Sequence, residues 1–219
     1  MLRIGIVDDH KLFRKSLSLL INSFKGMEVV LDADNGRTFL EKLVDNPIDI
    51  VLLDIQMPEM NGFETCKILH LQYPEIQILI VSQLTSKESI YKIMEIGAHG
   101  YFTKNSDPNL LETAIRSLDE KGFYFEMEFA HVMREALRWE KDAPERADAA
   151  DMMLTERELQ IIKMAANELN SYEIAEVMCI NKRTVEGHKT RIMEKTNSKN
   201  FIGVVLYALR NGILMIEEL

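Results

Sequence analysis

Five polar residues in the first half of this sequence stand at the ends of four short apolar runs. They are Asp8, Asp9, Asp54, Ser82 and Lys104. If the runs are parallel strands, their carboxyl ends meet at one edge of a sheet, where ligands of such folds bind. Clustered carboxylates repel each other unless a cation lies among them, and oxygen ligands of this kind suit Mg²⁺. A hydroxyl and a lysine opposite them would suit a phosphoryl group. Each residue alone is equally explained as a turn residue, a cap or a surface charge, so only the joint pattern is specific.

The segments that must position these residues alternate between strand-like and helix-like patterns up to about residue 121. This alternation predicts an α/β fold, a doubly wound, five-stranded parallel sheet of the flavodoxin-like type, covered by helices on both faces. Residues 4–7, 50–53 and 78–81 are almost wholly apolar, as buried parallel strands should be. The predicted strands are 3–7, 28–33, 48–54, 76–82 and 100–103, and the predicted helices are 10–24, 36–45, 61–73, 86–96 and 108–121.

The second half of the sequence reads as helical throughout. A helical stretch at about 126–141 and the polar run KDAPERADAAD form a predicted linker, 123–150, between a first domain at 1–122 and a small all-α domain at 151–219. Thr155 with Glu158, and Asn170 with Glu173, have the spacing of helix caps, and Asn181 is placed to cap a third helix at 182–196. A fourth helix is predicted at 199–210. The short turn before Asn181 makes the middle two helices a candidate helix-turn-helix.

Charge is unevenly distributed between these halves. The net charge of −9 argues against a nucleic-acid ligand, since affinity for DNA comes largely from basic residues on phosphates. The acidity is concentrated before residue 150, however, whereas residues 150–219 hold nine Lys and Arg against ten Asp and Glu. Residues 182–195 alone carry five basic residues against two glutamates. The local excess in that predicted helix keeps DNA binding open.

The first half resembles the receiver domain of response regulators, on the strength of IVDDH, LLDIQMPEMNG, IVSQ and GYFTK. The resemblance covers about residues 1–122 and implies that Asp54 is the phosphoacceptor for a sensor histidine kinase. It further implies that Asp8, Asp9, Asp54 and the backbone carbonyl of Gln56 hold Mg²⁺. Lys104 would pair with the phosphoryl oxygens, Ser82 would move to hydrogen-bond the phosphoryl group, and Tyr101 would rotate inward behind it.

The second half resembles the LuxR-type domain of NarL/FixJ-type regulators over about residues 150–214. The matching residues are L-T-x-R-E (154–158), E-I-A (173–175), T-V-E-G-H (184–188) and Lys195. The resemblance implies that the helix at 182–196 enters the major groove of DNA, and that its last helix pairs two copies of the protein into a homodimer. Core packing is an equally good explanation of that last apolar helix. The expected DNA-binding residues are Lys182, Arg183, Thr184, Glu186, Gly187, Lys189 and Thr190, with Lys189 on the exposed side of the helix.

Several residues depart from these patterns. Gln83 stands where receivers usually have a small residue, which puts the lifetime of a phosphorylated state in doubt. Glu186 and Thr190 stand where relatives often have basic residues, so a target sequence cannot be borrowed from them. Glu186 would accept a hydrogen bond from cytosine or weaken DNA binding, and Gly187 would allow close approach.

The favoured hypothesis is a transcription factor that is switched by phosphorylation and is active as a homodimer when phosphorylated. Apart from its own phosphorylation and slow dephosphorylation, it is not expected to catalyse a reaction. One alternative is a phosphorelay module whose helical domain docks another protein. Another is an α/β enzyme that hydrolyses phosphate esters. The absence of a Gly-rich phosphate loop from the sequence argues against this alternative. The N-terminus does not resemble a signal peptide and no run is long enough to span a membrane, so a cytoplasmic protein without a membrane partner is expected. The two cysteines, far apart, fit a reducing compartment.

Overall fold

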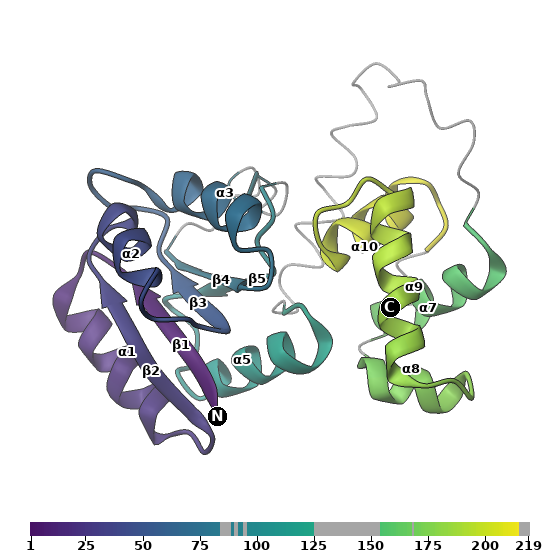
Figure 1. Ribbon diagram of the computed structural model, residues 1–219, viewed down its shortest axis with the longest axis horizontal. Helices are drawn as coiled ribbons and strands as arrows, with labels where there is room; N and C mark the ends of the chain where they lie inside the picture. Colours follow the sequence, from purple (N-terminus) through teal and green to yellow (C-terminus); the bar gives the residue numbers. More distant parts are fainter. Residues whose placement is uncertain (84–88, 90–91, 94–95, 125–153, 168, 215–219) are drawn as a thin grey trace. The chain divides into compact units, whose positions relative to one another are not determined.

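The computed structural model describes residues 1–83, 89, 92–93, 96–124, 154–167 and 169–214. The chain divides into two compact units, Met1–Glu126 and Met127–Leu219 (Figure 1). The predicted helical stretch at 126–141 and most of the predicted linker lie outside the described residues.

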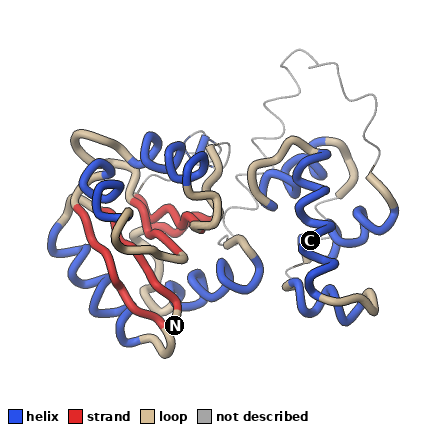
Figure 2. Tube along the Cα trace, viewed as in Figure 1, coloured by secondary structure: helices blue, strands red, loops and turns tan. Residues whose placement is uncertain are grey.

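The first unit is built around a five-stranded parallel sheet with the strand order β2-β1-β3-β4-β5, drawn in red in Figure 2. This order reverses direction beside β1, which is the arrangement expected of a flavodoxin-like fold and confirms the predicted fold class. All five predicted strands are present, with ends within two residues of the predicted ones. They are β1 (Leu2–Val7), β2 (Met27–Ala33), β3 (Ile50–Leu53), β4 (Gln77–Ser82) and β5 (Gly100–Thr103).

Helices cover both faces of this sheet (Figure 1). On one face, α1 (Lys11–Ser23) and α5 (Leu110–Lys121) pack against alternate strand residues, and the shared core includes Ile6, Leu52 and Leu79. On the other lie α2 (Gly36–Leu43) and α3 (Gly62–Gln72), and Phe39 of α2 is fully buried. The strands are therefore apolar on both sides, which explains their nearly continuous hydrophobic sequences.

The strand register brings the candidate site residues to one edge. Val7 pairs with Leu53, and Leu53 pairs with Ile80, so β1 and β3 end side by side and β4 runs slightly further. Ser82 pairs with Thr103 at the end of β5. The residues that follow these strands must therefore enter the same region, as the sequence predicts.

Two stretches of the first unit differ from the predicted elements or lie partly outside the described residues. The predicted helix at 86–96 falls mostly outside the described residues, although Ser89, Lys92 and Ile93 are helical. Phe123 and Tyr124, which the sequence places in the linker, are buried. The Tyr124 carbonyl accepts a bond from the Tyr101 N–H, at 3.4 Å, and its N–H donates to the His99 carbonyl, at 3.1 Å. The α/β unit thus extends past residue 122 because Tyr124 bonds to the open edge of β5.

The second unit is all-helical in its described part. It consists of α7 (Glu156–Ala166), α8 (Ser171–Val177), α9 (Lys182–Lys195) and α10 (Phe201–Arg210). The predicted caps are confirmed: Thr155 and Asn170 form reciprocal capping boxes with Glu158 and Glu173, and the Asn181 side chain accepts from the N–H of residue 184.

Packing in this unit joins α9 to the other helices. Val185 and Ile192 of α9 are fully buried, as are Ile161 and Ile162 of α7. Lys195 at the end of α9 donates to Glu158 at 2.7 Å, which ties the last turn of α9 to the first turn of α7. Phe201, Val204 and most other described side chains of α10 are buried, so the apolar sequence of that helix is accounted for by core packing. Among the described residues, no helix is both long and apolar enough to cross a bilayer.

Candidate functional site

Asp54 follows β3 and is almost fully buried, with 3% of its surface exposed. Its Oδ1 atom accepts a hydrogen bond from the Ile55 N–H at 2.7 Å, and its Oδ2 atom accepts one from Lys104 Nζ at 2.7 Å. The chain after Asp54 is held close by Gly62, because a Cβ atom at that position would lie 2.1 Å from the Asp54 carbonyl oxygen. The backbone thus fixes this carboxylate on a turn that only glycine can complete at residue 62.

Lys104, the residue after β5, joins two of the predicted acidic residues. Its Nζ atom lies 2.7 Å from Asp8 Oδ2 and 2.7 Å from Asp54 Oδ2. The ammonium group also lies 4.8 Å from the centre of the Phe13 ring, whose face attracts a cation. The predicted meeting of Asp8, Asp54 and Lys104 at the sheet edge is therefore present in the structure.

Burial and charge oppose each other in this cluster. Burial raises the pKa of Asp54 above its ordinary value; Lys104 opposes this rise and the charge of Asp8 adds to it. Burial by itself lowers the pKa of Lys104, but its hydrogen bonds to Asp54 and Asp8 and their charges together raise it. The raised pKa of Lys104 keeps its ammonium group charged. The raised pKa of Asp54 means that its surroundings disfavour the charged carboxylate, and further positive charge nearby would favour it.

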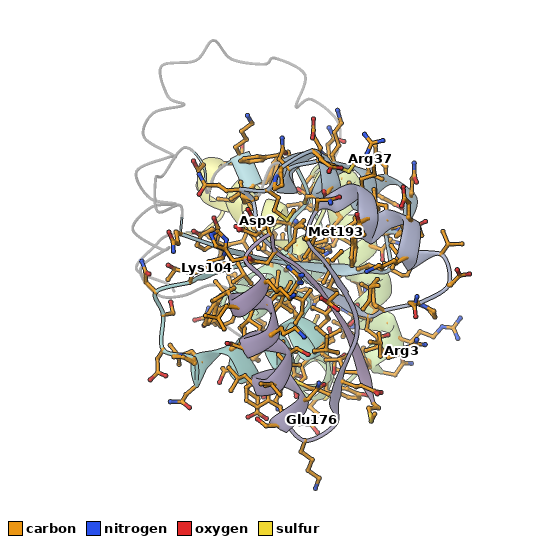
Figure 3. The ribbon with its side chains drawn as sticks, turned by 90° about the vertical axis from the view of Figure 1, so that its left-hand side faces the viewer. Arg3, Asp9, Arg37, Lys104, Glu176 and Met193 are labelled. Atoms are coloured by element: carbon orange, nitrogen blue, oxygen red, sulfur yellow. The ribbon has the colours of Figure 1, made fainter. Side chains whose placement is uncertain are left out.

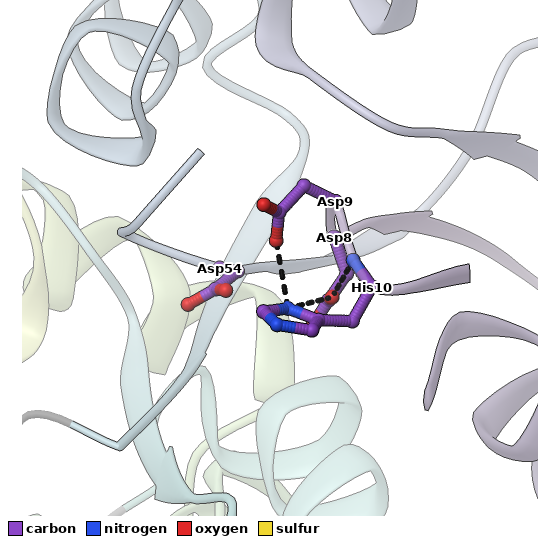
Figure 4. A group of neighbouring side chains, drawn as sticks. All are labelled: Asp8, Asp9, His10 and Asp54. Atoms are coloured by element: carbon purple, nitrogen blue, oxygen red, sulfur yellow. Dashed lines mark hydrogen bonds and ion pairs between the residues drawn. The ribbon is translucent and has the colours of Figure 1, made fainter. Parts of the chain in front are cut away.

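Asp9 and His10 complete a group that is suited to a metal ion (Figure 4). One ligand atom from each of Asp8, Asp9, His10 and Asp54 lies within 4.8 Å of the others. His10 Nδ1 lies 2.8 Å from Asp9 Oδ1 and 3.6 Å from Asp8 Oδ1, and both contacts are drawn in Figure 4. The donor set consists mainly of carboxylate oxygens, which fits a hard divalent cation. Figure 3 labels Asp9 and Lys104, which contribute opposite charges to this site.

Ser82 and Tyr101, the predicted switch residues, are both fully buried. The backbone carbonyl of Ser82 accepts two hydrogen bonds, one from the Lys104 N–H at 3.0 Å and one from the Tyr101 hydroxyl at 3.3 Å. Tyr101 therefore already occupies an inward position, which the resemblance to receiver domains implies for the phosphorylated state. The end of β4 is linked directly to the residue that carries the ammonium group.

An open pocket of about 360 Å³ leads to Asp54 and Lys104. Its rim includes Gln56, which is exposed and whose backbone carbonyl is the predicted fourth metal ligand, and Gln83, which is also exposed. Gln83, where receivers usually have a small residue, thus lies at the rim of the pocket through which a reactant would reach Asp54. Leu12, Phe13 and His10 line the remainder of the pocket.

The sequence did not single out two residues of this site. His10 follows the acidic pair directly, so its position in the chain was a usable signal for its contact with Asp9. Phe13 lies one helical turn after His10, and its spacing carried no information about the ring contact with Lys104. Sequence reasoning thus found the charged members of the cluster and missed its aromatic wall.

In the second unit, most of the predicted DNA-binding residues are exposed on α9. The exposed members are Lys182, Arg183, Thr184, Glu186, Gly187 and Thr190. Lys182 Nζ also lies 4.1 Å from the centre of the Tyr172 ring, on an exposed part of α8. This face of α9 is available for a ligand.

Lys189 is an exception, and its predicted exposure is wrong. Only 5% of its surface is exposed, its Nζ atom donates to Ser171 Oγ at 2.8 Å, and it lies 5.1 Å from the centre of the Phe201 ring. Its position, four residues after Val185 and three before Ile192, places it on the apolar side of the helix. Burial lowers the pKa of Lys189, opposed by the charge of Glu186. Lys189 therefore joins α9 to Ser171 of α8 and to Phe201 of α10.

The comparisons with known proteins agree with both units. Residues 4–116 match the response regulator receiver domain, and residues 152–208 match the bacterial regulatory proteins of the luxR family. The chain therefore belongs to the two-component response regulators that carry a LuxR-type helix-turn-helix DNA-binding domain and regulate transcription.

Named relatives cover nearly the whole chain. The oxygen regulatory protein NreC of Staphylococcus epidermidis is 32% identical over 217 residues, which covers 97% of this chain and 99% of that protein. NreC of Staphylococcus aureus is 32% identical over 216 residues, with the same coverage of both chains.

Solved structures extend the likeness to the fold. A LuxR-family two-component response regulator from an Aurantimonas species is 30% identical, with a TM-score of 0.57, and matches 61% of this chain and 96% of that one. The response regulator RcsB in complex with DNA has a TM-score of 0.57 over 95% of this chain and 98% of that one. At 17% identity, that second likeness concerns the fold alone.

Proposed function

We propose that this response regulator accepts a phosphoryl group on Asp54 from a sensor histidine kinase, and that phosphorylation strengthens its binding to specific double-stranded DNA as a homodimer. The observation that carries the proposal is the buried Asp54 carboxylate, bonded through Oδ2 to Lys104 at 2.7 Å and open to solvent through a pocket. The chain acts as a switch rather than as a metabolic enzyme, because the pocket offers one acceptor that must be regenerated after each transfer.

Phosphoryl transfer to Asp54 follows from these contacts. A carboxylate oxygen of Asp54 attacks the phosphorus of a phosphohistidine; the O–P bond forms as the N–P bond breaks, and the released imidazole takes a proton from solvent. The N–H of Ile55 holds the acceptor carboxylate during the approach. Lys104 lies against the same carboxylate, so its ammonium group stabilises the negative charge that arrives with the phosphoryl group.

A magnesium ion fits the carboxylates of Asp8, Asp9 and Asp54 and the backbone carbonyl of Gln56. When bound, the ion supplies positive charge that offsets the charge on the phosphoryl oxygens. The role of this chain's own residues is to gather the ligands: β1 presents Asp8 and Asp9, and β3 presents Asp54. His10, bonded to Asp9 at 2.8 Å, orients the most exposed of the three carboxylates.

The added group brings about −1.5 to −2 of charge and three acceptor oxygens. Lys104 then exchanges a carboxylate partner for phosphoryl oxygens, and the Ser82 hydroxyl gains an acceptor. Because the Ser82 carbonyl accepts from both Lys104 and Tyr101, these adjustments reach the end of β4 and the interior ring together. A local charge change thereby alters one face of the unit.

The DNA-binding part of the proposal rests on the exposed face of α9. Lys182 and Arg183 in its first turn supply positive charge, and the residues that follow reach the bases. The burial of Lys189 removes one cation from this face, so the flanking exposed basic residues contribute more of the phosphate contacts than the sequence suggests.

The test measures phosphorylation, assembly and DNA binding together. The full chain is incubated with magnesium and an acyl phosphate donor, its mass is followed by intact-protein mass spectrometry, and its binding sites are mapped by genomic footprinting. We expect one added phosphoryl group, a shift from monomer to dimer in light scattering, and DNA binding at least tenfold tighter.

Asp54→Asn should lose all three responses, while Asp119→Asn, an exposed carboxylate on α5, should retain them. Unchanged DNA binding with and without phosphorylation would remove the switch. Capture of a protein partner with no affinity for any duplex would favour the docking module instead, and turnover of a free phosphate ester would favour the enzyme.

A further inference from the structure

The exposed stripe on α9 has an unusual composition for a helix that meets DNA. Residues spaced three or four apart share a side of a helix. Val185, Lys189 and Ile192 form the buried side. The opposite, exposed side consists of Arg183, Glu186, Gly187, Thr190, Arg191 and Glu194. Beyond the first turn this stripe holds one cation, Arg191, at its border, so its centre offers little to phosphates and must be considered for contacts with bases.

Glu186 is the one acidic side chain in the middle of this stripe. It is exposed, and no hydrogen bond or ion pair holds its carboxylate within the part of the chain that the structure describes. A carboxylate only accepts hydrogen bonds. In the major groove, the groups that donate are the N4 amino group of cytosine and the N6 amino group of adenine. Adenine also presents the N7 acceptor next to its amino group, which repels a carboxylate, so cytosine is the better partner.

Gly187 is unexplained by the fold of the unit. A glycine inside a helix costs about 1 kcal/mol relative to alanine. Gly187 has ordinary helical backbone geometry, and a Cβ atom at this position would meet nothing within 4 Å. Neither packing nor backbone conformation therefore requires it. Glycine is used where a backbone must come close to a ligand, and this one lies beside Glu186 on the exposed side.

Thr190 lies one turn further along the stripe. Its hydroxyl donates to the Glu186 carbonyl at 3.0 Å, so its hydrogen is already used within the helix. It therefore faces a ligand with an acceptor oxygen and a methyl group. The centre of the stripe offers acceptors, a methyl group and a bare backbone, which is a pattern for reading base edges and not for neutralising phosphates.

We infer that Glu186 and Gly187 determine the base specificity of this protein: Gly187 allows α9 to approach the floor of the major groove, and Glu186 there accepts a hydrogen bond from the N4 amino group of a cytosine in each half-site. The inference rests on the proposed function, since it requires that α9 binds duplex DNA.

The experiment selects preferred sequences from a randomised duplex library with the full-length phosphorylated chain. For the unaltered protein we expect one position of each half-site to be enriched in cytosine. Glu186→Gln should lose this enrichment and shift it to adenine, because an amide both donates and accepts and so pairs with adenine N6 and N7. The preference for cytosine over adenine should fall at least tenfold. Glu194→Gln, two turns further along the same stripe, is the matched control and should leave the preference unchanged.

Gly187→Ala tests the close approach separately. We expect this substitution to raise the melting temperature of the free protein and yet to weaken binding to the selected duplex at least tenfold. A decrease in stability would not support the inference, and neither would binding as tight as that of the unaltered protein; either result would overturn the role of Gly187.

Different outcomes would overturn the proposed function and the inference. If the unaltered chain binds no duplex at any salt concentration, the proposed function is wrong and the inference falls with it. If it binds DNA with a defined sequence preference that Glu186→Gln leaves intact, the proposed function stands and the inference alone is overturned.

Discussion

Each of the two units contains a lysine whose side chain is little exposed to solvent, and the two lysines differ in their partners. Lys104 bonds two carboxylates at 2.7 Å each, while Lys189 bonds the hydroxyl of Ser171 at 2.8 Å. The pKa of Lys104 is raised, because Asp54 and Asp8 outweigh the effect of burial, whereas burial lowers that of Lys189. Residue type and charge therefore do not reveal a role by themselves: bonds to two carboxylates make one lysine part of a charged site, and a bond to a hydroxyl makes the other a packing element.

The largest effect should come from removing the cation of the first site. Lys104→Met leaves two nearly buried carboxylates without their partner, and breaking a buried ion pair from one side costs about 3–5 kcal/mol. We expect the free energy of unfolding, measured by urea denaturation without divalent ions, to fall by about 3 kcal/mol, a figure at the low end of that range. Added magnesium should restore part of this loss. Stability equal to that of the unaltered chain would show that the Lys104 contacts contribute nothing.

A third buried base, His99, tests whether burial without a carboxylate keeps a base neutral. Burial, with a smaller contribution from the charge of His70, lowers the pKa of His99 from 6.5 to about 4. Its Nδ1 atom accepts a hydrogen bond from the Ile78 N–H at 3.1 Å, which only the neutral ring can do. A base with a lowered pKa in the folded state stabilises the fold fully above its ordinary pKa and loses that contribution as the pH falls.

We therefore expect the free energy of unfolding to decrease by about 3 kcal/mol as the pH falls through this window, at about 1.36 kcal/mol per pKa unit. The loss should begin near pH 6.5 and be complete near pH 4. Chemical denaturation at a series of pH values measures it. His99→Asn should show a smaller loss over the same range, and an equal loss in that variant would assign the pH dependence to other groups.

A smaller effect is expected at the acceptor itself. Because burial raises the pKa of Asp54, its charged form destabilises the folded state, and this destabilisation is present at neutral pH and disappears as the pH falls below the raised value. Asp54→Asn removes the charge and should stabilise the magnesium-free protein by about 1 kcal/mol, as expected for relief of strain stored at a functional site. Thermal unfolding measures the change; a lower melting temperature would mean that the bond to Lys104 outweighs the cost of burial.

The smallest effect should be at Lys189. Lys189→Met keeps the volume and apolar stem of the side chain, so we expect DNA affinity and its salt dependence to stay unchanged. Arg191→Ala, an exposed cation on the same helix, should reduce the slope of affinity against salt by about one unit if it contacts a phosphate. Fluorescence anisotropy at several salt concentrations compares the two variants. A reduced slope in Lys189→Met would return this lysine to the DNA-binding face and end the contrast with Lys104.

Most of the first site was predictable because a parallel sheet imposes a simple rule on sequence. Asp8, Asp54 and Lys104 follow apolar runs, and parallel strands end at one edge. The helix caps were also predictable, since Thr155 and Asn170 act on residues only three positions away. Contacts between residues close in the sequence, and contacts between residues that follow parallel strands, can both be predicted from the order of residues.

The orientation of α9 was less accessible. Lys189 has the spacing of a residue on the same side of the helix as Val185 and Ile192, which are buried. A lysine at such a position is nevertheless predicted to be exposed unless its buried partner is known. That partner, Ser171, comes from the neighbouring helix, and Phe201 from the next. Contacts between helices depend on packing angles, which single-sequence periodicity does not contain. The same reason hid Phe13 from the first site.

One oxygen atom in the first unit has a wider consequence. The Ser82 carbonyl is shared between a backbone donor on the loop of Lys104 and a hydroxyl donor in the interior. Because one oxygen atom accepts both hydrogen bonds, a shift of this peptide group changes the geometry of both, and the loop and the aromatic ring respond to the same displacement. Any agent that displaces residue 82, whether a ligand, a substitution or a change of solvent, should therefore be detectable as a change in the environment of the ring, long before either unit unfolds.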